Sequence, residues 1–193
     1  MQNKVLYIIS GCNGAGKTTA SFTILPEILN CKEFVNADEI AKGLSPFQPE
    51  KVAIEAGRLM LYRIKDLLNQ GKTFAFETTL STKSYKNTIK TAEESGYEVI
   101  LLFFWLQTVE LAIERVKQRV IEGGHNIEQN VIKRRYQYGI KNLFQIYLPI
   151  VRNAMIIDNS DNIFQLIAKK QNNQLNIIDN LKFNFLKKIS DEK

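Results

Sequence analysis

The chain of 193 residues has few of the side chains that build metal sites and disulfide frameworks: one histidine and two cysteines. Cys12 and Cys31 lie 19 positions apart and outside any C-x-x-C pair, which argues against a disulfide scaffold and a zinc site. We therefore expect two free thiols. The lone His125 stands in a Gly-Gly-His-Asn turn, where we expect a turn or capping role rather than that of a metal ligand or base.

The sequence also lacks a long apolar run. The run near the N-terminus covers only residues 5–9, which is too short for the core of a signal peptide. The longest run, Val99–Leu106, is far below the roughly 20 residues that a membrane-spanning helix needs. We therefore expect a cytoplasmic protein that has no membrane partner.

Positive charge exceeds negative charge, with 26 lysines and arginines against 20 aspartates and glutamates and a formal net charge of +6. Such an excess suits nucleic acid or a small polyanionic substrate. Much of it lies between Arg115 and Arg135 and in a tail that contains Lys182, Lys187 and Lys188. No stretch interleaves aromatic and basic residues as single-strand-binding proteins do, so nucleic acid is the less favoured partner.

Short β-rich apolar runs alternate along the chain with segments of helical periodicity. These runs are continuously apolar, which is typical of parallel strands covered on both faces. The alternation predicts an α/β fold with a doubly wound sheet, in one domain over residues 1–193. The expected strands are 4–10, 33–38, 73–78, 97–106 and 154–160; the expected helices begin near 17 and cover 49–69, 83–95, 108 to the glycine turn at 123–126, and 127–153, before a small hairpin within 162–178 and a terminal helix.

One stretch carries a specific motif. Residues 7–20, YIISGCNGAGKTTA, contain the pattern G-x-x-x-x-G-K-S/T between an apolar run and a helical segment. In that setting backbone N–H groups converge on phosphate oxygens, the lysine reaches the outer phosphates and the hydroxyl holds Mg²⁺. A glycine-rich strand-to-helix turn is the alternative. The motif predicts ATP and Mg²⁺ here, with Thr18 as the metal ligand and with nucleotide contacts from Gly11, Asn13, Gly14, Ala15, Gly16, Lys17, Thr18 and Thr19.

Three acidic residues stand at the ends of expected strands: Asp38, Glu77 and Asp158. Ligands of open parallel sheets bind beyond the carboxyl ends of the strands. One of these acids could bind Mg²⁺ through water, and another could take the proton of an acceptor hydroxyl. For each, a helix N-cap or a turn is the structural alternative, above all for Asp38, which directly precedes a helical segment.

The basic stretch predicts a lid. Phosphoryl transfer spreads negative charge over the equatorial oxygens, and arginines on a closing helical lid can meet that charge. Arg115 and Arg119 are four residues apart and share a helix face, and Arg134 and Arg135 lie on the next helix, beyond a glycine hinge at 123–124. The alternative is that these arginines are solvated charges on amphipathic helices.

Six segments occur in an order that resembles the zeta toxin family of P-loop kinases, in its short, free-standing bacterial branch. They are GCNGAGKTT, VNADEIAKGLSP, FAFETTLST, ERVKQRVIEGGHNI, IKRRYQYGIKNL and IIDNS, and they span about residues 3–160. The resemblance implies a five-stranded, mostly parallel sheet with helices on both faces. We expect the helical lid to cover about 108–153, and residues 161–193 to form a C-terminal extension beyond the part that the resemblance covers. The characterised toxins use ATP and Mg²⁺ to phosphorylate the 3'-hydroxyl of UDP-N-acetylglucosamine.

Carried over by position, the resemblance implies that Lys17 and Thr18 hold ATP and Mg²⁺, and that Asp38 is the base on the acceptor hydroxyl. Glu77 and Thr79 would contact the substrate. The remaining implied roles are those of lid arginines on the transferred phosphate, Arg119 and either Arg134 or Arg135, and of a loop beside the adenine, Asn159 and Ser160.

The sequence does not identify the molecule that accepts the phosphoryl group. In the toxins' acceptor-site motif a basic residue is expected soon after the aspartate, and here the nearest candidate after Asp38 is Lys42. The sequence favours an ATP-dependent kinase of a small hydroxyl-bearing molecule, such as a nucleotide sugar. One alternative is a nucleotide-gated regulator or toxin component whose main partner is an antitoxin protein. A nucleic-acid kinase or ATPase is a third and less favoured function.

Overall fold

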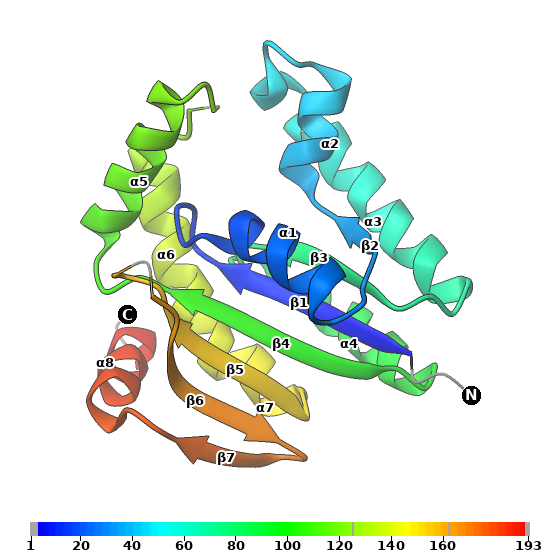
Figure 1. Cartoon of the computed structure of the whole chain (residues 1–193), viewed down its shortest axis with the longest axis vertical. Helices are drawn as coiled ribbons and strands as arrows, with labels where there is room; N and C mark the ends of the chain where they lie inside the picture. Colours follow the sequence, from blue (N-terminus) through cyan, green and yellow to red (C-terminus); the bar gives the residue numbers. More distant parts are fainter. Residues whose placement is uncertain (1–3, 125, 162, 192–193) are drawn as a thin grey trace.

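The structure, a computed structural model, describes residues 4–124, 126–161 and 163–191. Within them seven strands form one sheet (Figure 1): β1 (Val5–Gly11), β2 (Glu33–Val35), β3 (Phe74–Thr78), β4 (Glu98–Trp105), β5 (Asn153–Asp158), β6 (Gln165–Gln171) and β7 (Gln174–Ile177). Their order across the sheet is β2-β3-β1-β4-β5-β6-β7. The strands from β1 to β5 are parallel, whereas β6 runs antiparallel to β5 and β7 antiparallel to β6.

The sheet has two strands more than the five that the resemblance implies. The hairpin expected from the tail forms as β6 and β7, and its turn contains Asn172 and Asn173 in left-handed conformations, with φ of 50° and 68°. β6 then pairs with β5 from Ala154 to Asp158. Because an edge strand has unpaired N–H and C=O groups, the hairpin adds to the sheet instead of standing apart from it. The predicted α/β class is confirmed, and the strand count is corrected to seven.

Helices cover both faces of the sheet. The helical elements are α1 (Lys17–Glu27), α2 (Ala37–Leu44), the 3-10 turn η1 (Pro49–Val52), α3 (Ala53–Asn69), α4 (Tyr85–Glu94), α5 (Val109–Ile121), α6 (Gln129–Asn142), the π-helical turn η2 (Leu143–Tyr147), α7 (Leu148–Ile150) and α8 (Asn180–Asp191). In Figure 1 α1 lies in front of the sheet, and α6 and α7 pass behind it. None of the described helices is both long and apolar enough to cross a membrane.

The central strands are buried as their apolar sequences predict. Ile8 and Ile9 on β1, and Phe103 and Phe104 on β4, are consecutive pairs that point to opposite faces, and each is at most 2% exposed, so the core extends on both sides of these strands. Cys12 and Cys31 are both free and buried, as expected. Burial raises the pKa of each thiol to about 11, so neither is a reactive thiolate at neutral pH.

Helices α2 and α5 begin just after the carboxyl ends of the parallel strands β2 and β4, and each is followed by a second helix, α3 and α6. In Figure 1 α2 and α3 rise on one side, and α5 and α6 rise on the other. α5 ends at a glycine turn: Gly123 has a φ of 92°, and the N–H of Gly124 donates to the carbonyl of Arg119 at 2.8 Å. The segment 108–153, expected as a lid, comprises α5, α6, η2 and α7. His125, expected in the turn, lies outside the described residues.

Candidate active site

The motif loop connects β1 to α1, and packing around it requires glycine. A Cβ atom on Gly11, which has a φ of 137°, would lie 2.1 Å from the carbonyl oxygen of Phe104 in the neighbouring strand. A Cβ on Gly16, with a φ of 80°, would lie 2.5 Å from Nδ2 of Asn159. Gly16 is also the N-cap of α1 and provides no capping side chain. The first turn of α1 therefore presents backbone N–H groups that suit an anion.

Lys17, the first residue of α1, is held across this loop. Its ammonium donates to the carbonyl oxygen of Cys12 at 2.8 Å and lies 3.5 Å from Oε1 of Glu77. Only 5% of its side chain is exposed. A buried ammonium in this position is a preorganised positive charge at the mouth of the loop.

Glu77, at the end of β3, connects three elements. Its Oε2 accepts hydrogen bonds from the Thr18 hydroxyl at 2.7 Å and from the amide of Asn36 at 3.0 Å. Glu77 therefore lies beside Lys17 and Thr18, the predicted phosphate and metal residues. Mg²⁺ prefers oxygen ligands in an octahedron that substrate phosphates and water usually complete. The hydroxyl of Thr18 and the carboxylate of Glu77 are ligands of this kind, so the two residues fit the ion.

Asp38 is the second residue of α2, and the capping role that the sequence leaves open for it belongs to Asn36. The side-chain oxygen of Asn36 accepts from the backbone N–H of Asp38 at 2.8 Å and from that of Glu39 at 3.4 Å. The amide of Asn36 also donates to Glu77, so one asparagine holds the backbone at Asp38 and the carboxylate of Glu77. The carboxylate of Asp38 is thus not used as the helix cap.

Two cavities share Asp38. The inner cavity, of about 190 Å³, is lined by Lys17, Glu77 and Thr79 among other residues, and the outer cavity, of about 750 Å³, lies between α2, η1 and the start of α6. Asp38 and Arg135 line both. The structure therefore brings together the motif lysine, the strand-end acids Asp38 and Glu77, and Arg135 of α6.

Arg135 is the arginine of the adjacent pair that reaches this site. Its Nη1 donates to Oδ1 of Asn13 in the motif loop at 3.1 Å. Burial lowers the pKa of its guanidinium. The negative charge of Asp38 opposes this shift, and the positive charge of Arg134 adds to it. Arg135 nevertheless stays charged at neutral pH, as arginines do in proteins. Arg134 is exposed and lines neither cavity, so the structure does not bring it into the site.

The two arginines of α5 have different surroundings. Arg119 is half-buried against the glycine turn, where a Cβ on Gly124 would lie 2.7 Å from its Cγ, and it lines neither cavity. Arg115, one turn earlier, donates from Nη2 to the carbonyl of Ser160 at 2.7 Å. Arg115 thus contacts the loop that the resemblance places beside the adenine.

That loop, residues 158–160, packs against the motif loop. Nδ2 of Asn159 donates to the carbonyl of Ala15 at 3.0 Å, and Ser160 accepts from the N–H of Gln107 at 2.9 Å. The sequence leaves open whether Asp158 binds Mg²⁺ through water or takes the proton of an acceptor hydroxyl. In the structure its carboxylate is instead paired with the ammonium of Lys182 at 2.7 Å. Its side chain is therefore engaged by the C-terminal helix, and it lines neither cavity.

The other predicted contacts lie around the same loops. Gly14 packs against α5, where a Cβ would lie 2.8 Å from the carbonyl of Ala112, and the side chain of Thr19 is exposed. The hydroxyl of Thr79 lies 2.9 Å from that of Ser81. Leu80 has a φ of 59°, and its carbonyl accepts from Asn142 of α6 at 2.9 Å. The segment after β3 is thus held by α6.

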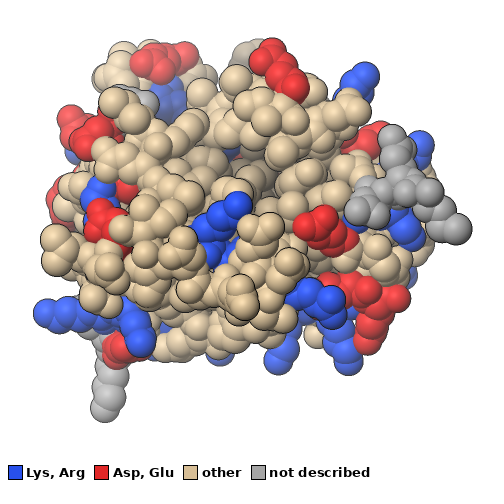
Figure 2. Space-filling model, turned by 60° about the horizontal axis from the view of Figure 1, so that its bottom comes forward, with Lys and Arg blue, Asp and Glu red and all other residues tan. Residues whose placement is uncertain are grey.

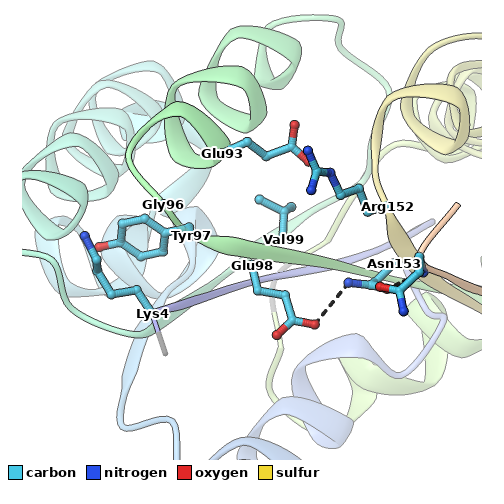
Figure 3. Close-up of a pocket in the computed structure, with 9 residues that line it drawn as sticks. Lys4, Glu93, Gly96, Tyr97, Glu98, Val99, Arg152 and Asn153 are labelled. Carbon is cyan, nitrogen blue, oxygen red and sulfur yellow. Dashed lines mark hydrogen bonds between the residues drawn. The ribbon is translucent and has the colours of Figure 1, made fainter. Parts of the chain in front are cut away.

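A further hollow, of about 470 Å³, lies at the opposite end of β1 and β4 (Figure 3). In Figure 3 the side chains of Glu93 and Arg152 point toward one another. The amide of Asn153 donates to Glu98 at 3.0 Å. None of the residues predicted for the site lines this hollow.

Sequence reasoning missed the role of Asn36. Its signal was available, since asparagine is a preferred N-cap and stands just before the helical segment that contains Asp38. The role of Lys182 had no such signal, because it pairs with a residue 24 positions away in the chain.

Comparisons with known proteins bear on the family and the fold. The family model described as zeta toxin matches residues 1–172. The chain belongs to the zeta toxin family. An uncharacterised protein of Haemophilus influenzae is 34% identical over 136 residues, which cover 70% of this chain and 94% of that protein.

Two solved structures have the same fold as this zeta toxin family member. A chain of the AvrRxo1-ORF1:ORF2 complex, solved with ATP, has a TM-score of 0.77 at 17% identity, and the match covers 97% of this chain but only 64% of that one. A chain of the PezAT toxin-antitoxin system of Streptococcus pneumoniae has a TM-score of 0.65 at 16% identity and covers 98% and 86%. The fold is that of P-loop kinases, as the sequence predicts.

Proposed function

We propose that the protein is an ATP-dependent kinase that transfers the γ-phosphoryl group of ATP to a hydroxyl group of a small molecule. The observation that carries the proposal is the inner cavity, which is lined at once by Lys17, Asp38 and Arg135. A phosphate-binding lysine, a candidate base and a cation from the lid are the parts that phosphoryl transfer needs. The family and the ATP of the AvrRxo1 structure support the same function.

Each residue has a defined task in this proposal. The motif loop and Lys17 hold the phosphates of ATP, and Asn159 and Ser160 flank its adenine side. Asp38 orients the acceptor hydroxyl and takes its proton, and Arg135 stabilises the charge on the transferred group. Mg²⁺, held by Thr18 with Glu77 beside it, would neutralise phosphate charge. Catalysis is then positioning plus electrostatic stabilisation.

The outer cavity is the proposed acceptor site, with Thr79 contacting the acceptor from the inner cavity. UDP-N-acetylglucosamine is the acceptor that the family resemblance suggests. The outer cavity is lined by three carboxylates, Asp38, Glu50 and Glu128, and by one cation, Arg135. A diphosphate would require cations from outside this lining, so a sugar without phosphate groups belongs in the same screen.

A screen of acceptors tests the proposal. The protein is incubated with ATP, Mg²⁺ and, separately, UDP-N-acetylglucosamine, N-acetylglucosamine and a panel of polyols, and mass spectrometry detects any molecule that gains a phosphate group. We expect one class to be phosphorylated. ATP consumption without any phosphorylated acceptor across the panel would count against a small-molecule kinase.

The second candidate function is that of a nucleotide-gated regulator or toxin component whose main partner is an antitoxin protein. AvrRxo1-ORF1 and PezAT, two of the structural relatives, are described as complexes or systems of two components. In this chain Phe47, between α2 and η1, and Ile54, in the first turn of α3, are 97% and 76% exposed, and such apolar side chains favour a protein contact. Copurification of a small protein that blocks binding of a fluorescent ATP analogue would support a regulator, and its absence from native preparations would favour a free-standing enzyme.

The nucleic-acid alternative has less support. Figure 2 shows a face on which basic and acidic side chains are interspersed and separated by uncharged surface. Proteins that bind nucleic acid gather their lysines and arginines into a patch or stripe. ATP hydrolysis that rises when oligonucleotides are added would revive this alternative.

The two adjacent lid arginines give a matched test. We expect Arg135→Met to lower turnover by about 10²–10³-fold, because a preorganised cation on the transferred phosphate is lost. Arg134→Met, a change of the same size one position away on the exposed face of α6, should stay within about twofold of the wild type. Steady-state assays with the acceptor found in the screen measure both. Equal losses in the two variants would contradict the assignment of Arg135.

Glu77 gives a test of the metal side. Glu77→Gln keeps the shape of the side chain but removes the charge beside Thr18 and Lys17. We expect the Mg²⁺ concentration for half-maximal binding of a fluorescent ATP analogue to rise by about 10-fold, as for other partners of metal ligands. Glu98→Gln, in the hollow at the far end of the sheet, is the control. An unchanged Mg²⁺ dependence would place Glu77 with the acceptor alone.

A further inference from the structure

We propose that Lys182, on the C-terminal helix α8, is a positioning residue for the ATP site, where it holds loop 158–160 against the motif loop. α8 lies beyond residues 1–172, which the family model matches. Figure 1 shows α8 (red) beside the edge of the sheet formed by β6 and β7, opposite the edge near α2 and α3. The inference rests on the proposed ATP-dependent function. It adds that nucleotide binding requires a lysine of α8, outside the sequence motifs.

The ion pair of Lys182 is largely shielded from water. Its ammonium lies 2.7 Å from Oδ2 of Asp158, whose side chain is 2% exposed, and it also donates to Oε1 of Gln165 at 2.7 Å. Burial alone would raise the pKa of Asp158, but hydrogen bonds from Lys182 and Ser160 outweigh burial and hold that pKa below its usual value. The carboxylate therefore stays ionised at neutral pH and depends on Lys182 for its countercharge.

Asp158, held by Lys182, in turn fixes the conformation of the next two residues. Its Oδ1 accepts from the backbone N–H of Ser160 at 2.9 Å and from the hydroxyl of Ser160, which fixes the turn. The turn places the amide of Asn159 on the carbonyl of Ala15 at 3.0 Å. Gly16 lies directly under Asn159, with room for no Cβ atom. The ion pair and the motif loop are therefore linked by three consecutive residues.

α8 is itself held in place, so that Lys182 is presented from a fixed backbone. The ring of Phe183 packs against that of Phe144 with centroids 5.4 Å apart, and the amide of Gln145 donates to the carbonyl of Ser190 at 3.0 Å. Removing the ammonium would leave a buried carboxylate that must take up a proton or turn toward water. Either change releases the turn at Ser160 and with it the contact of Asn159 with the motif loop.

The test is nucleotide affinity in Lys182→Met. A fluorescent ATP analogue with Mg²⁺ is titrated at 20 °C, where thermal melts must first show each variant to be folded. We expect the Kd to rise about 10-fold in Lys182→Met, since a charge-assisted contact supports the loop, and to return to within about twofold of the wild type in Lys182→Arg. Lys188→Met, an exposed lysine of the same helix, should leave the Kd unchanged. If Lys182→Met does not fold, Lys182→Gln takes its place.

The outcomes separate this inference from the proposed function. A lower melting temperature with an unchanged Kd at 20 °C would make Lys182 a structural residue only and would overturn the inference. An equal rise of Kd in Lys188→Met would do the same, because it would reflect net charge rather than the ion pair. If the wild-type protein does not bind the analogue, the proposed function itself fails.

Discussion

Asp38→Asn is expected to lower phosphoryl transfer by about 10³-fold, or ~4 kcal/mol in the activation free energy, while the affinity for ATP changes by less than about threefold. The substitution keeps the size of the side chain and the N-cap that Asn36 provides to α2. It removes the group that can take the acceptor's proton. The motif loop and Lys17 are left intact, so nucleotide binding should persist.

Steady-state turnover with the identified acceptor and titration of a fluorescent ATP analogue measure these two effects separately. Glu39→Gln is the matched control, because Glu39 is the next residue of α2 and forms an exposed pair with Lys42 at 2.7 Å. Exposed pairs of this kind contribute at most about 1 kcal/mol. Turnover at the wild-type level in Asp38→Asn would remove Asp38 from the role of base, and a large loss of ATP affinity would place it with the nucleotide.

Lys17→Met is expected to damage both binding and chemistry. The ammonium is buried at 5% exposure and fixed by Cys12 and Glu77, so it is ready to meet phosphate oxygens without reorganisation. Its loss should weaken binding of an ATP analogue by about 10-fold or more and lower turnover by about 10²–10³-fold. The thioether has a similar length, so the packing of α1 against the sheet should survive.

Calorimetric titration with a non-hydrolysable ATP analogue, together with a thermal melt, tests this expectation. Lys65→Met, on the exposed surface of α3, is the control for a change in net charge. ATP affinity as in the wild type would contradict the assignment of the motif loop as a phosphate site. A loss of affinity that accompanies unfolding would instead show that Lys17 stabilises the fold.

Local sequence was enough to predict the parallel core and the centre of the site. The motif fixes the strand, the loop and the start of α1 within a few residues, and Asp38 and Glu77 stand at the ends of expected strands whose carboxyl ends lie at the same edge. The strand count could not be predicted in the same way. β6 joins the sheet through pairing with β5, which depends on where the chain turns after loop 158–160.

The choice between Arg134 and Arg135 also required the structure. Neighbouring helix residues point about 100° apart, so the contact depends on the rotation of α6, which is set by buried residues such as Tyr136 and Ile140. The pairing of Lys182 with Asp158 depends on how α8 packs after the hairpin. Contacts of this kind arise from tertiary packing, and no local pattern in the chain encodes them.

The central claim is that ATP and an acceptor hydroxyl meet at the cavity shared by Lys17, Asp38 and Arg135. Its most direct test uses ATP with oxygen-18 in the γ-phosphoryl group, a pool of small metabolites, and mass spectrometry of the products. We predict that the wild-type protein moves the labelled phosphoryl group to a hydroxyl of one small molecule and that Asp38→Asn does not. Labelled inorganic phosphate as the only product of the wild type, or equal transfer by Asp38→Asn, would contradict the claim.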